Sequence, residues 1–510
     1  HFYAATSLEK LDRLQDGVAM LERLRRRNPE EPLKNRTAFA LGEYLYRLGR
    51  PAEALPHLKT VYTLRDTPSA DLLYRLAWAY YDTGKADEAE RLFHRLSERE
   101  SAYSAEAAYM RGRCLQKTGK AAAAREAYQK IAAVGKRNSY VAQALYRLAF
   151  LQDTQEAVET IDRYARLFPD GEHRPQLALK ATEDLLQAGH VEKAAARYRR
   201  LLEERLSGID PGVVHYGLGW CALKRGNLQQ ADTHFTKALE GDLGEQRRVD
   251  ARLQRGEIAY RQKDYKKALS FFRDVAQSGN PARERARYML AWCHRHLEQT
   301  DKARSAFRRF LEEHPKSQFA ADSALRLAEL LLNAGEAAQA EQVLADALSK
   351  PLPQEIEQEM LYLYIRVLAA QKKWKDTLTS CERFLDAYPN AEKLHRIFFR
   401  RGIARKGLGL NAKARESFEK TIAATDTIEA AKARFNIASI LFSEGDYLEA
   451  GKNFVRITIL YDYPELIPKS LYYAVKSFRE AGDEERARQY LEELRNDYPD
   501  SQWTQKSEEL

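Results

Sequence analysis

One column of small side chains constrains the fold of this chain more than any other feature. Alanine or another small residue recurs fourteen times at intervals of 33 to 37 residues, and twelve of the fourteen are alanine. A period of this length indicates a solenoid, in which one structural unit is repeated along the chain. This anchor column consists of Gly17, Ala54, Ala89, Ala124, Ala157, Ala194, Ala231, Ala268, Ala303, Ala340, Thr377, Ala414, Ala450 and Ala487.

Other columns keep the same register. Four residues after the anchor, most units carry a large apolar residue such as Phe235, which shares a helical face with the anchor. Five residues before it, nine units carry glycine, as at Gly84, which fits the left-handed residue that ends a helix. A small residue such as Gly219 stands twelve before the anchor, and a proline such as Pro315 stands twelve after it in five units. Each unit therefore predicts a helix A, a tight turn and a helix B, and the units must stack to bury their apolar faces.

These columns resemble the tetratricopeptide repeat (TPR) family, whose units combine a Leu-Gly pair, a later alanine, an aromatic residue and a proline. The pattern is legible in residues 41–58, LGEYLYRLGRPAEALPHL, and in residues 218–235, LGWCALKRGNLQQADTHF. The resemblance covers essentially all 510 residues. It implies an all-α, right-handed superhelical solenoid of about thirteen helical pairs, forming a single domain over residues 1–510.

A narrower resemblance concerns the cellular setting. Residues 314–344 resemble bacterial cell-envelope TPR proteins, namely the outer-membrane assembly lipoprotein and the periplasmic Tol–Pal coordinator, which carry a similar Pro-x-Ser before an alanine-rich helix. This favours a periplasmic or cell-envelope location. The alternative is the cytoplasm, because four cysteines without a pairing pattern are typical of a reducing compartment.

The rhythm of the repeat is irregular in a few places. Residues 1–30 predict a partial first repeat, with a helix B over residues 11–27 and no full helix A, so we expect a longer natural protein. At 150–157 four residues and the turn glycine are missing, and 349–357 carries two prolines. Each of these two places predicts a kink or partial domain boundary, or else a small adjustment of the superhelical pitch. Residues 501–510 predict the start of another helix.

Composition excludes several classes of protein. The net charge is +9, but 74 acidic residues stand among 83 basic ones, a bias too weak for a dedicated nucleic-acid binder. No run approaches the roughly 18 to 20 uncharged apolar residues of a membrane-spanning helix, so the chain is predicted not to be transmembrane. The four cysteines lie 72 to 107 residues apart without a CxxC pair, and we predict that they form no disulfide.

Motifs of catalysis and metal binding are missing from the sequence. It contains no HExxH, no P-loop and no GxSxG. One cluster, Cys293-His294-Arg295-His296, combines zinc-binding residue types, but no fourth ligand is visible, and a helix-packing cysteine beside solvated histidines is the favoured interpretation. We therefore predict a protein that is not an enzyme and carries no cofactor or metal.

By the resemblance, one face of helix A lines a concave groove. That face includes an aromatic column fifteen residues before the anchor and a column eleven residues before it that carries three of the five tryptophans. Tyrosine and tryptophan dominate interface hot spots, although the tyrosines could equally serve packing between helices. Glutamate replaces the tryptophan in other units, as at Glu43, Glu257 and Glu329, so we expect this column to face solvent. The candidate pairs are Tyr74/Trp78, Tyr216/Trp220 and Tyr288/Trp292.

Toward the C-terminus the same face becomes basic. Residues 395–406, HRIFFRRGIARK, contain no acid. Such a stretch can hold an acidic peptide, a polar lipid headgroup or an anionic glycan, and the alternative is a solvated basic helix. The carboxylate clamp of chaperone-binding TPR proteins is approached only by Lys432 and Asn436, so we reject a heat-shock-protein tail as ligand. The candidate binding residues in this region are Tyr362, Arg366, Arg396, Phe399 and Lys406.

These features predict a non-enzymatic scaffold that binds segments of other proteins in a concave aromatic and basic groove. The favoured setting is a bacterial cell-envelope assembly, secretion or motility complex. One alternative is a glycan-binding TPR superhelix of an exopolysaccharide export system, with an anionic polysaccharide as ligand. Another is the regulatory TPR arm of a larger enzyme. Nucleic acid is not an expected partner.

Overall fold

A computed structural model describes residues 1–133 and 137–510. In these ranges the chain consists of helices and their connections, without a β-strand, which confirms the predicted all-α solenoid of helix pairs. The chain divides into two compact units, residues 1–251 and 252–510, and each is described by itself. The single domain expected over residues 1–510 stays a prediction.

The first unit contains helices that alternate between the predicted helix A and helix B. They are α1 (Phe2–Lys10), α2 (Leu14–Arg26), α3 (Leu33–Arg47), α4 (Pro51–Thr63), α5 (Ala70–Asp82), α6 (Ala86–Ser97), α7 (Ser104–Lys117), α8 (Ala121–Ala133), α9 (Ser139–Leu148), α10 (Thr154–Leu167), α11 (Arg174–Gln187), α12 (Val191–Glu204), α13 (Pro211–Lys224) and α14 (Leu228–Glu240). Helix α15 (Gly244–Arg261) contains the point at which the two units divide.

The second unit continues the alternation and ends in a short extra helix. Its helices are α16 (Tyr265–Ala276), α17 (Ala282–His296), α18 (Thr300–Glu313), α19 (Ala320–Asn333), α20 (Ala337–Leu348), α21 (Gln354–Ala370), α22 (Trp374–Ala387), α23 (Leu394–Gly407), α24 (Asn411–Ala424), α25 (Ile428–Ser443), α26 (Tyr447–Leu460), α27 (Ile467–Glu480), α28 (Glu484–Asp497), α29 (Gln502–Lys506) and the 3₁₀ turn η1 (Ser507–Glu509).

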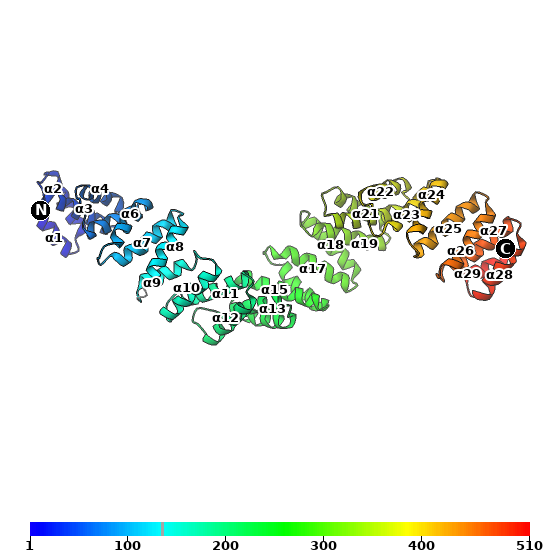
Figure 1. Ribbon diagram of the computed structural model, residues 1–510, viewed down its shortest axis with the longest axis horizontal. Helices are drawn as coiled ribbons and strands as arrows, with labels where there is room; N and C mark the ends of the chain where they lie inside the picture. Colours follow the sequence, from blue (N-terminus) through cyan, green and yellow to red (C-terminus); the bar gives the residue numbers. More distant parts are fainter. Residues whose placement is uncertain (134–136) are drawn as a thin grey trace. The chain divides into compact units, whose positions relative to one another are not determined.

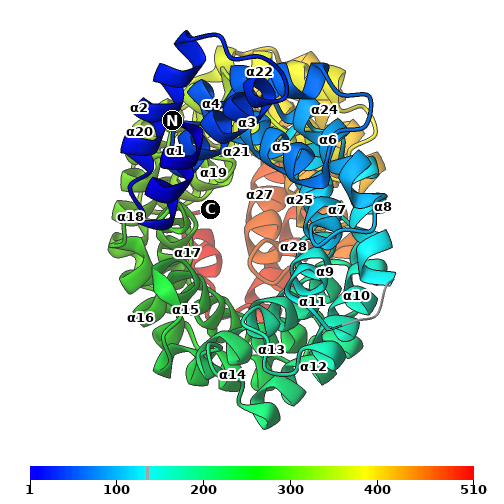
Figure 2. The same cartoon turned by 90° about the vertical axis from the view of Figure 1, so that its left-hand side faces the viewer.

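In each unit consecutive helices follow one another in space (Figure 1). Figure 2 shows that in the first unit α5, α7, α9, α11 and α13 lie along the inner side of a curve, with α6, α8, α10 and α12 outside them. The second unit has the same order, with α17, α19 and α21 inside and α16, α18, α20 and α22 outside. The odd-numbered helices are the predicted helices A, so their inner side forms the concave face of each unit.

The turn between helix A and helix B is left-handed, as predicted. At the position five residues before the anchor, the nine glycines have φ between +74° and +84°. Four units place another residue there, and its φ is still positive, at 56° to 62°. The conformation therefore belongs to the repeat and not to glycine alone. These four residues are Asp12, Lys263, Glu298 and Lys372.

The small columns allow the two helices of a unit to approach closely. An added Cβ at Gly219 would lie 2.7 Å from the Phe235 ring, and one at Gly402 would lie 2.5 Å from the Phe418 ring. Both phenylalanines are fully buried, as are the anchors Ala231 and Ala414. The packing predicted from the columns is thus the same in both units.

The irregular places have simple local descriptions. Helix α9 has 10 residues where α7 and α11 have 14, which confirms the missing four residues before position 157. Residues 349–353 connect α20 to α21, a helix of 17 residues. Helix α1, with nine residues, precedes α2 in the first repeat. Helix α29 confirms the helix predicted after the last proline. The kinks expected at 150–157 and 349–357 stay predictions.

The four cysteines are buried in separate helices. Burial raises the pKa of Cys221 to about 11 and the pKa values of Cys114, Cys293 and Cys381 to about 12. A thiol with so high a pKa is a poor nucleophile and metal ligand at neutral pH. The cysteines therefore act as small apolar side chains in the packing between helices.

Candidate functional site

The tyrosines of the aromatic column connect neighbouring units. Tyr74 of α5 donates a hydrogen bond to Glu106 of α7, at 3.0 Å, and Tyr216 of α13 donates to Asp250 of α15, at 2.6 Å. Burial, together with the nearby carboxylate, raises the pKa of the Tyr74 hydroxyl to about 12. A donor with so high a pKa keeps its proton at neutral pH. The hydroxyls of Tyr74 and Tyr216 therefore serve contacts between units, and the binding role of their rings stays a prediction.

The same bond occurs in the second unit. Tyr288 of α17 donates to Asp322 of α19, at 2.8 Å, and stacks on Phe319 with ring centroids 4.6 Å apart. In each of the three bonds the acceptor occupies one position of the repeat, eighteen residues before the anchor of its own unit. The sequence analysis did not identify this acidic position, whose side chains hold the tyrosines in place.

The tryptophans are half-buried and divide their surface between packing and solvent. Trp78, Trp220 and Trp292 each meet the buried phenylalanine of helix B edge-on. The centroid distances to Phe93, Phe235 and Phe307 are 5.8, 6.2 and 6.1 Å. These contacts anchor each indole to the repeat. Trp292 is further contacted by His296, at 5.7 Å between centroids, and by the guanidinium groups of Arg295 and Arg326, and Trp78 meets Tyr81 at 5.7 Å.

The glutamates that replace these tryptophans are half-buried and paired with arginine, so their presence does not show that the column is open to solvent. Glu43 pairs with Arg75 at 3.0 Å, and the Glu257 side chain, only 12% exposed, pairs with Arg285 at 2.5 Å. Glu329 pairs with both Arg295, at 3.0 Å, and Arg326, at 3.1 Å. A glutamate is tolerated at this column because an arginine of the same or an adjacent helix A neutralises it.

The predicted basic residues separate onto two sides of α23. Arg396 lies 3.6 Å from Glu429 of α25, and Lys406 donates to Asn436 of the same helix at 2.9 Å. Phe399 packs against the buried Phe418, at 5.9 Å between centroids. Arg405 instead donates to Ser417 of α24 at 2.8 Å, away from this face. On α21, the Arg366 guanidinium lies 5.9 Å from the centre of the Tyr362 ring.

The cations of this region repel one another. Burial lowers the pKa of Arg400, and the charge of Arg366 lowers it further. Burial and the charge of Lys469 on α27 lower the pKa of Lys406. Lys469 itself lies over the rings of Phe435 and Trp503, at 4.6 and 5.6 Å. Arg400 was named from sequence only as part of a basic stretch, and Lys469 was missed because it lies far along the chain.

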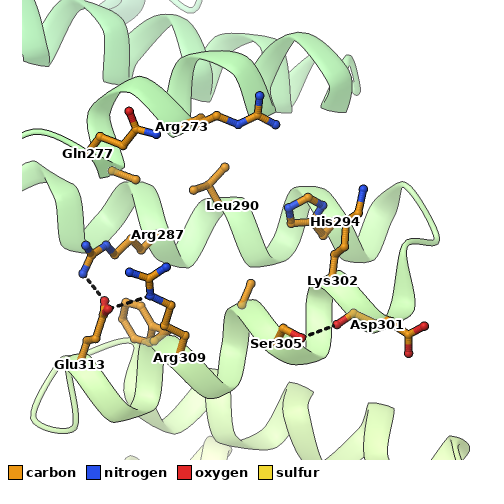
Figure 3. A pocket seen from close by; sticks show the side chains of 13 residues that line it. Arg273, Gln277, Arg287, Leu290, His294, Asp301, Lys302, Ser305, Arg309 and Glu313 are labelled. Atoms are coloured by element: carbon orange, nitrogen blue, oxygen red, sulfur yellow. Dashed lines mark hydrogen bonds and ion pairs between the residues drawn. The ribbon is translucent and has the colours of Figure 1, made fainter.

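A separate groove of about 740 Å³ opens between α16 and α18, over α17 (Figure 3). Its floor is apolar, with Leu290 and Phe310, and at one end Arg287 and Arg309 both turn toward Glu313. Leu290 is two residues from Trp292, which places it about 200° around the helix from that indole. The groove therefore opens on the opposite side of α17 from the aromatic column.

The groove belongs to the repeat geometry. A similar one, of about 390 Å³, lies over α7 between α6 and α8. Arg111 and Leu290 stand at one repeat position in the two grooves, and so do Ile131 and Phe310. Space between successive outer helices thus recurs along the solenoid, and it does not distinguish a single ligand site.

Comparison with known protein families decides what kind of repeat this is. A tetratricopeptide repeat model matches residues 4–71, 74–140, 179–242, 216–283, 325–392 and 399–458. A second such model matches 45–102 and 259–322, and a third matches 469–501.

The chain belongs to the tetratricopeptide repeat family.

Solved structures with TPR-like helical folds resemble it at low identity. A structure of Naa15/Naa10 bound to HypK-THB is 13% identical, covers 90% of this chain and 75% of that chain, and gives a TM-score of 0.38. Pseudomonas aeruginosa pilF is 21% identical, covers 44% of this chain and 96% of that chain, and gives a TM-score of 0.33. No curated protein matches this TPR chain.

None of the matching TPR models describes a catalytic domain. Among the residues that the structure describes, no group of three or more His, Cys, Asp and Glu side chains is placed to hold a metal ion. In the Cys293 cluster, His294 contacts Gln299 and His296 stacks on Tyr265, at 4.4 Å between centroids. Over the same described ranges, no helix of this TPR chain has the length and apolarity to span a bilayer.

Proposed function

We propose that this TPR protein is a non-enzymatic scaffold that binds segments of other proteins on the concave faces of its helices A. The observation that carries the proposal is that Trp78, Trp220 and Trp292 each meet a buried phenylalanine edge-on and are half-buried, so that each indole is held in place and is not enclosed in the core. A large ring held in one orientation loses little conformational entropy when it binds, which is why such rings act as interface hot spots.

Each tryptophan stands beside a fixed tyrosine of the same helix. Tyr74 and Trp78 meet edge-on at 6.4 Å, and Tyr288 and Trp292 do so at the same distance. Because the tyrosine hydroxyls already bond to the next unit, the pair offers mainly apolar ring surface to a partner. This surface favours apolar side chains of a polypeptide.

Photo-crosslinking tests this proposal. A photoreactive phenylalanine analogue replaces Trp220 on the inner helix α13, and a matched control replaces the exposed Thr233 on the outer helix α14. In the cells that make the protein, we expect position 220 to crosslink to defined segments of other proteins and position 233 not to do so. Equal crosslinking from both positions, or crosslinks only to carbohydrate, would contradict the proposal.

Binding strength provides a second measurement once a partner is in hand. Trp220→Ala should weaken binding by more than about 1 kcal/mol, as expected for a hot-spot aromatic. Thr233→Ala should leave the affinity unchanged. A folded Trp220→Ala variant that binds as tightly as the parent would remove the indole from the binding surface.

The setting we propose is the bacterial cell envelope, within an assembly, secretion or motility complex. The resemblance of residues 314–344 to envelope TPR proteins supports it. Fractionation of the native cells, with protease treatment of intact and osmotically opened cells, tests the location. Recovery of the protein only with cytoplasmic markers would contradict the envelope setting and leave the scaffold proposal intact.

A further inference from the structure

The inner side of the last helices A carries a row of cations. Six basic side chains of α21, α23, α25 and α27 form what we name the C-terminal basic face. Three of them stand at one repeat position, eighteen residues before the anchor, on three successive helices A. These three are Arg396, Lys432 and Lys469, and the other members of the face are Arg366, Arg400 and Lys406.

Most cations of this face lack an internal counter-charge. In the described ranges, Arg396 is the one member of the six with a carboxylate within 4 Å, that of Glu429 at 3.6 Å. Lys406 donates to the neutral amide oxygen of Asn436, and Arg366 and Lys469 lie against aromatic rings. Lys432 is exposed, whereas Arg400, Lys406 and Lys469 are half-buried. Half-buried positive charges without a carboxylate partner are unfavourable, so a bound anion would stabilise this face.

The same repeat position is acidic in several earlier units, although two others carry Arg36 and Arg285 there. Glu106, Asp250 and Asp322 occupy it, and each accepts the hydroxyl of a column tyrosine. In the last units the position is basic, and two of the column tyrosines are replaced by Phe399 and Phe435, which have no hydroxyl to donate. The tyrosine that donates and the carboxylate that accepts have thus both been replaced at Phe399 and Lys432, and at Phe435 and Lys469. A positive charge without a carboxylate partner stands where the hydrogen bond between units would be.

The face has two ends. Before it, the equivalent position of α21 is Glu359, whose carboxylate lies 3.6 Å from Arg326. After it, α29 places Trp503 against Tyr472 and Tyr473, with centroids 5.4 and 5.9 Å apart. A surface three units long between an acidic end and an aromatic end fits a short bound segment.

We propose that the C-terminal basic face binds an acidic segment of a partner protein. Carboxylates of the segment would pair with the row of Arg396, Lys432 and Lys469, since guanidinium and ammonium groups recognise carboxylates through charge-assisted hydrogen bonds. Apolar side chains between those carboxylates would contact the half-buried rings of Phe399 and Phe435. This inference rests on the scaffold function proposed above and names the chemistry of its partner.

The surroundings favour a polypeptide over other anions. The Asn436 amide, a neutral group that could orient a sugar hydroxyl, already accepts from Lys406 and donates to the Lys432 carbonyl. A nucleic acid needs positive potential over a long stretch of backbone, and Glu359 and Glu429 interrupt it here. An acidic peptide needs only the cations and rings that the face provides.

Peptide display on the full chain tests the inference. The immobilised protein selects from a random library of peptides of about twelve residues, and the enriched sequences are measured against two variants. One variant combines Arg396→Gln, Lys432→Gln and Lys469→Gln on the basic face. The matched control combines Lys375→Gln, Lys413→Gln and Arg488→Gln, three exposed cations of the outer helices α22, α24 and α28. Circular dichroism and denaturation midpoints establish that both variants are folded.

We expect the enriched peptides to be rich in Asp and Glu, with apolar residues between them. Their affinity should fall at least about tenfold in the face variant, stay within about twofold in the control, and decrease with salt. Enriched peptides that are not acidic, or that bind both variants alike, would overturn this inference and leave the scaffold proposal standing. A library from which no peptide is enriched would count against both proposals.

A competition experiment tests whether the face prefers a polypeptide to other anionic polymers. Alginate, an acidic polysaccharide, and single-stranded oligothymidylate are titrated against the selected peptide. We expect each to displace the peptide at least about tenfold less well, at equal concentration of negative charge. Displacement by alginate or the oligonucleotide that matches the peptide and is lost in the face variant would overturn the assignment to a polypeptide.

Discussion

The helices α17 and α19 and the helices α23 and α25 occupy equivalent places in their repeats, but they treat charge in opposite ways. In the first pair, Tyr288 bonds to Asp322, and Arg295 pairs with Glu329. In the second pair, Phe399 faces a position held by a lysine, and the cation equivalent to Arg295 is Lys406, which meets only an amide. The comparison teaches that the repeat determines the packing, whereas the concave surface varies independently of it.

This difference separates stability from binding. A face whose charges pair internally contributes to stability and leaves little net charge to attract an ion. A face of unpaired cations is unfavourable in the free protein and gains when a complementary partner neutralises it. The two groups of helices therefore predict opposite responses to the removal of a charge.

The largest effect we expect is the same in both groups, because it concerns packing. Ala231→Leu and Ala414→Leu each insert a larger side chain where helix A and helix B cross, beside Phe235 and Phe418. Each should destabilise its unit by about 1 to 3 kcal/mol or more, since the site has no room to relax. Denaturant midpoints provide the measurement. If only one of the two variants is destabilised, the packing of the two units is not equivalent.

Charge removal from the paired group should have the next largest effect. Glu329→Ala leaves Arg295 and Arg326 without a shared carboxylate and should destabilise the protein by about 1 to 2 kcal/mol. Glu312→Ala, at an exposed site of α18, is the control and should change stability by less than about 0.5 kcal/mol. Similar midpoints for the two variants would show that the ion pairs of this face do not stabilise it.

The sequence alone predicted the parts of the fold that local chemistry determines. The anchor column, the glycine turn and the close contact at Gly219 all follow from the shape of a helix pair, which every unit repeats. Repetition made the pattern visible without any other protein for comparison. The shortened helix α9 could be predicted for the same reason, because a missing turn shifts every column by four residues.

The candidate site was only partly predictable, because its contacts join residues that are far apart in sequence. The sequence predicts exposure for Glu43, Glu257 and Glu329, because the arginines that pair with them across helices lie 28 to 34 residues away along the chain. The acidic position of Glu106, Asp250 and Asp322 was present in the sequence, but its role depends on a tyrosine of the preceding unit. A column of the repeat shows which residues occupy equivalent positions, but it does not show which side chains contact one another in the folded chain.

A smaller effect of opposite sign should follow charge removal from the unpaired group. Lys406→Met removes a half-buried cation near Lys469, at the loss of one bond to Asn436. We expect stabilisation by up to about 1 kcal/mol near neutral pH. Arg295→Met removes the equivalent cation from the paired group and should instead destabilise. Destabilisation by Lys406→Met of the same size would remove the contrast between the two faces.

The stabilisation should also depend on pH. The pKa of Lys406 is lowered in the folded protein by burial and by Lys469, so the unfolded chain holds this proton more tightly. The contribution of Lys406 to stability therefore rises as the pH passes the folded pKa, up to the unfolded value of about 10.4. The advantage of Lys406→Met over the parent should shrink as the pH rises from neutral toward the unfolded pKa of about 10.4. A difference in midpoint that stays constant over this range would show that the charge of Lys406 is not the cause.

The smallest effect concerns the turns, which we expect to be independent of the charge of the concave face. Lys263, Glu298 and Lys372 adopt φ of 57° to 62°, where a side chain is disfavoured by about 1 to 2 kcal/mol per residue. Glycine relieves that strain, but it costs about 0.5 to 1 kcal/mol of additional backbone entropy. Each substitution by glycine should thus stabilise by about 0.5 kcal/mol. Gly335→Ala, the converse change at an equivalent turn with φ of 80°, should destabilise.

Because turn and face are separate, the gain from Lys372→Gly, next to the basic face, should equal the gain from Glu298→Gly, next to the paired face. A clear inequality in their denaturation midpoints would mean that the unpaired charges alter the backbone of the repeat and not only its surface.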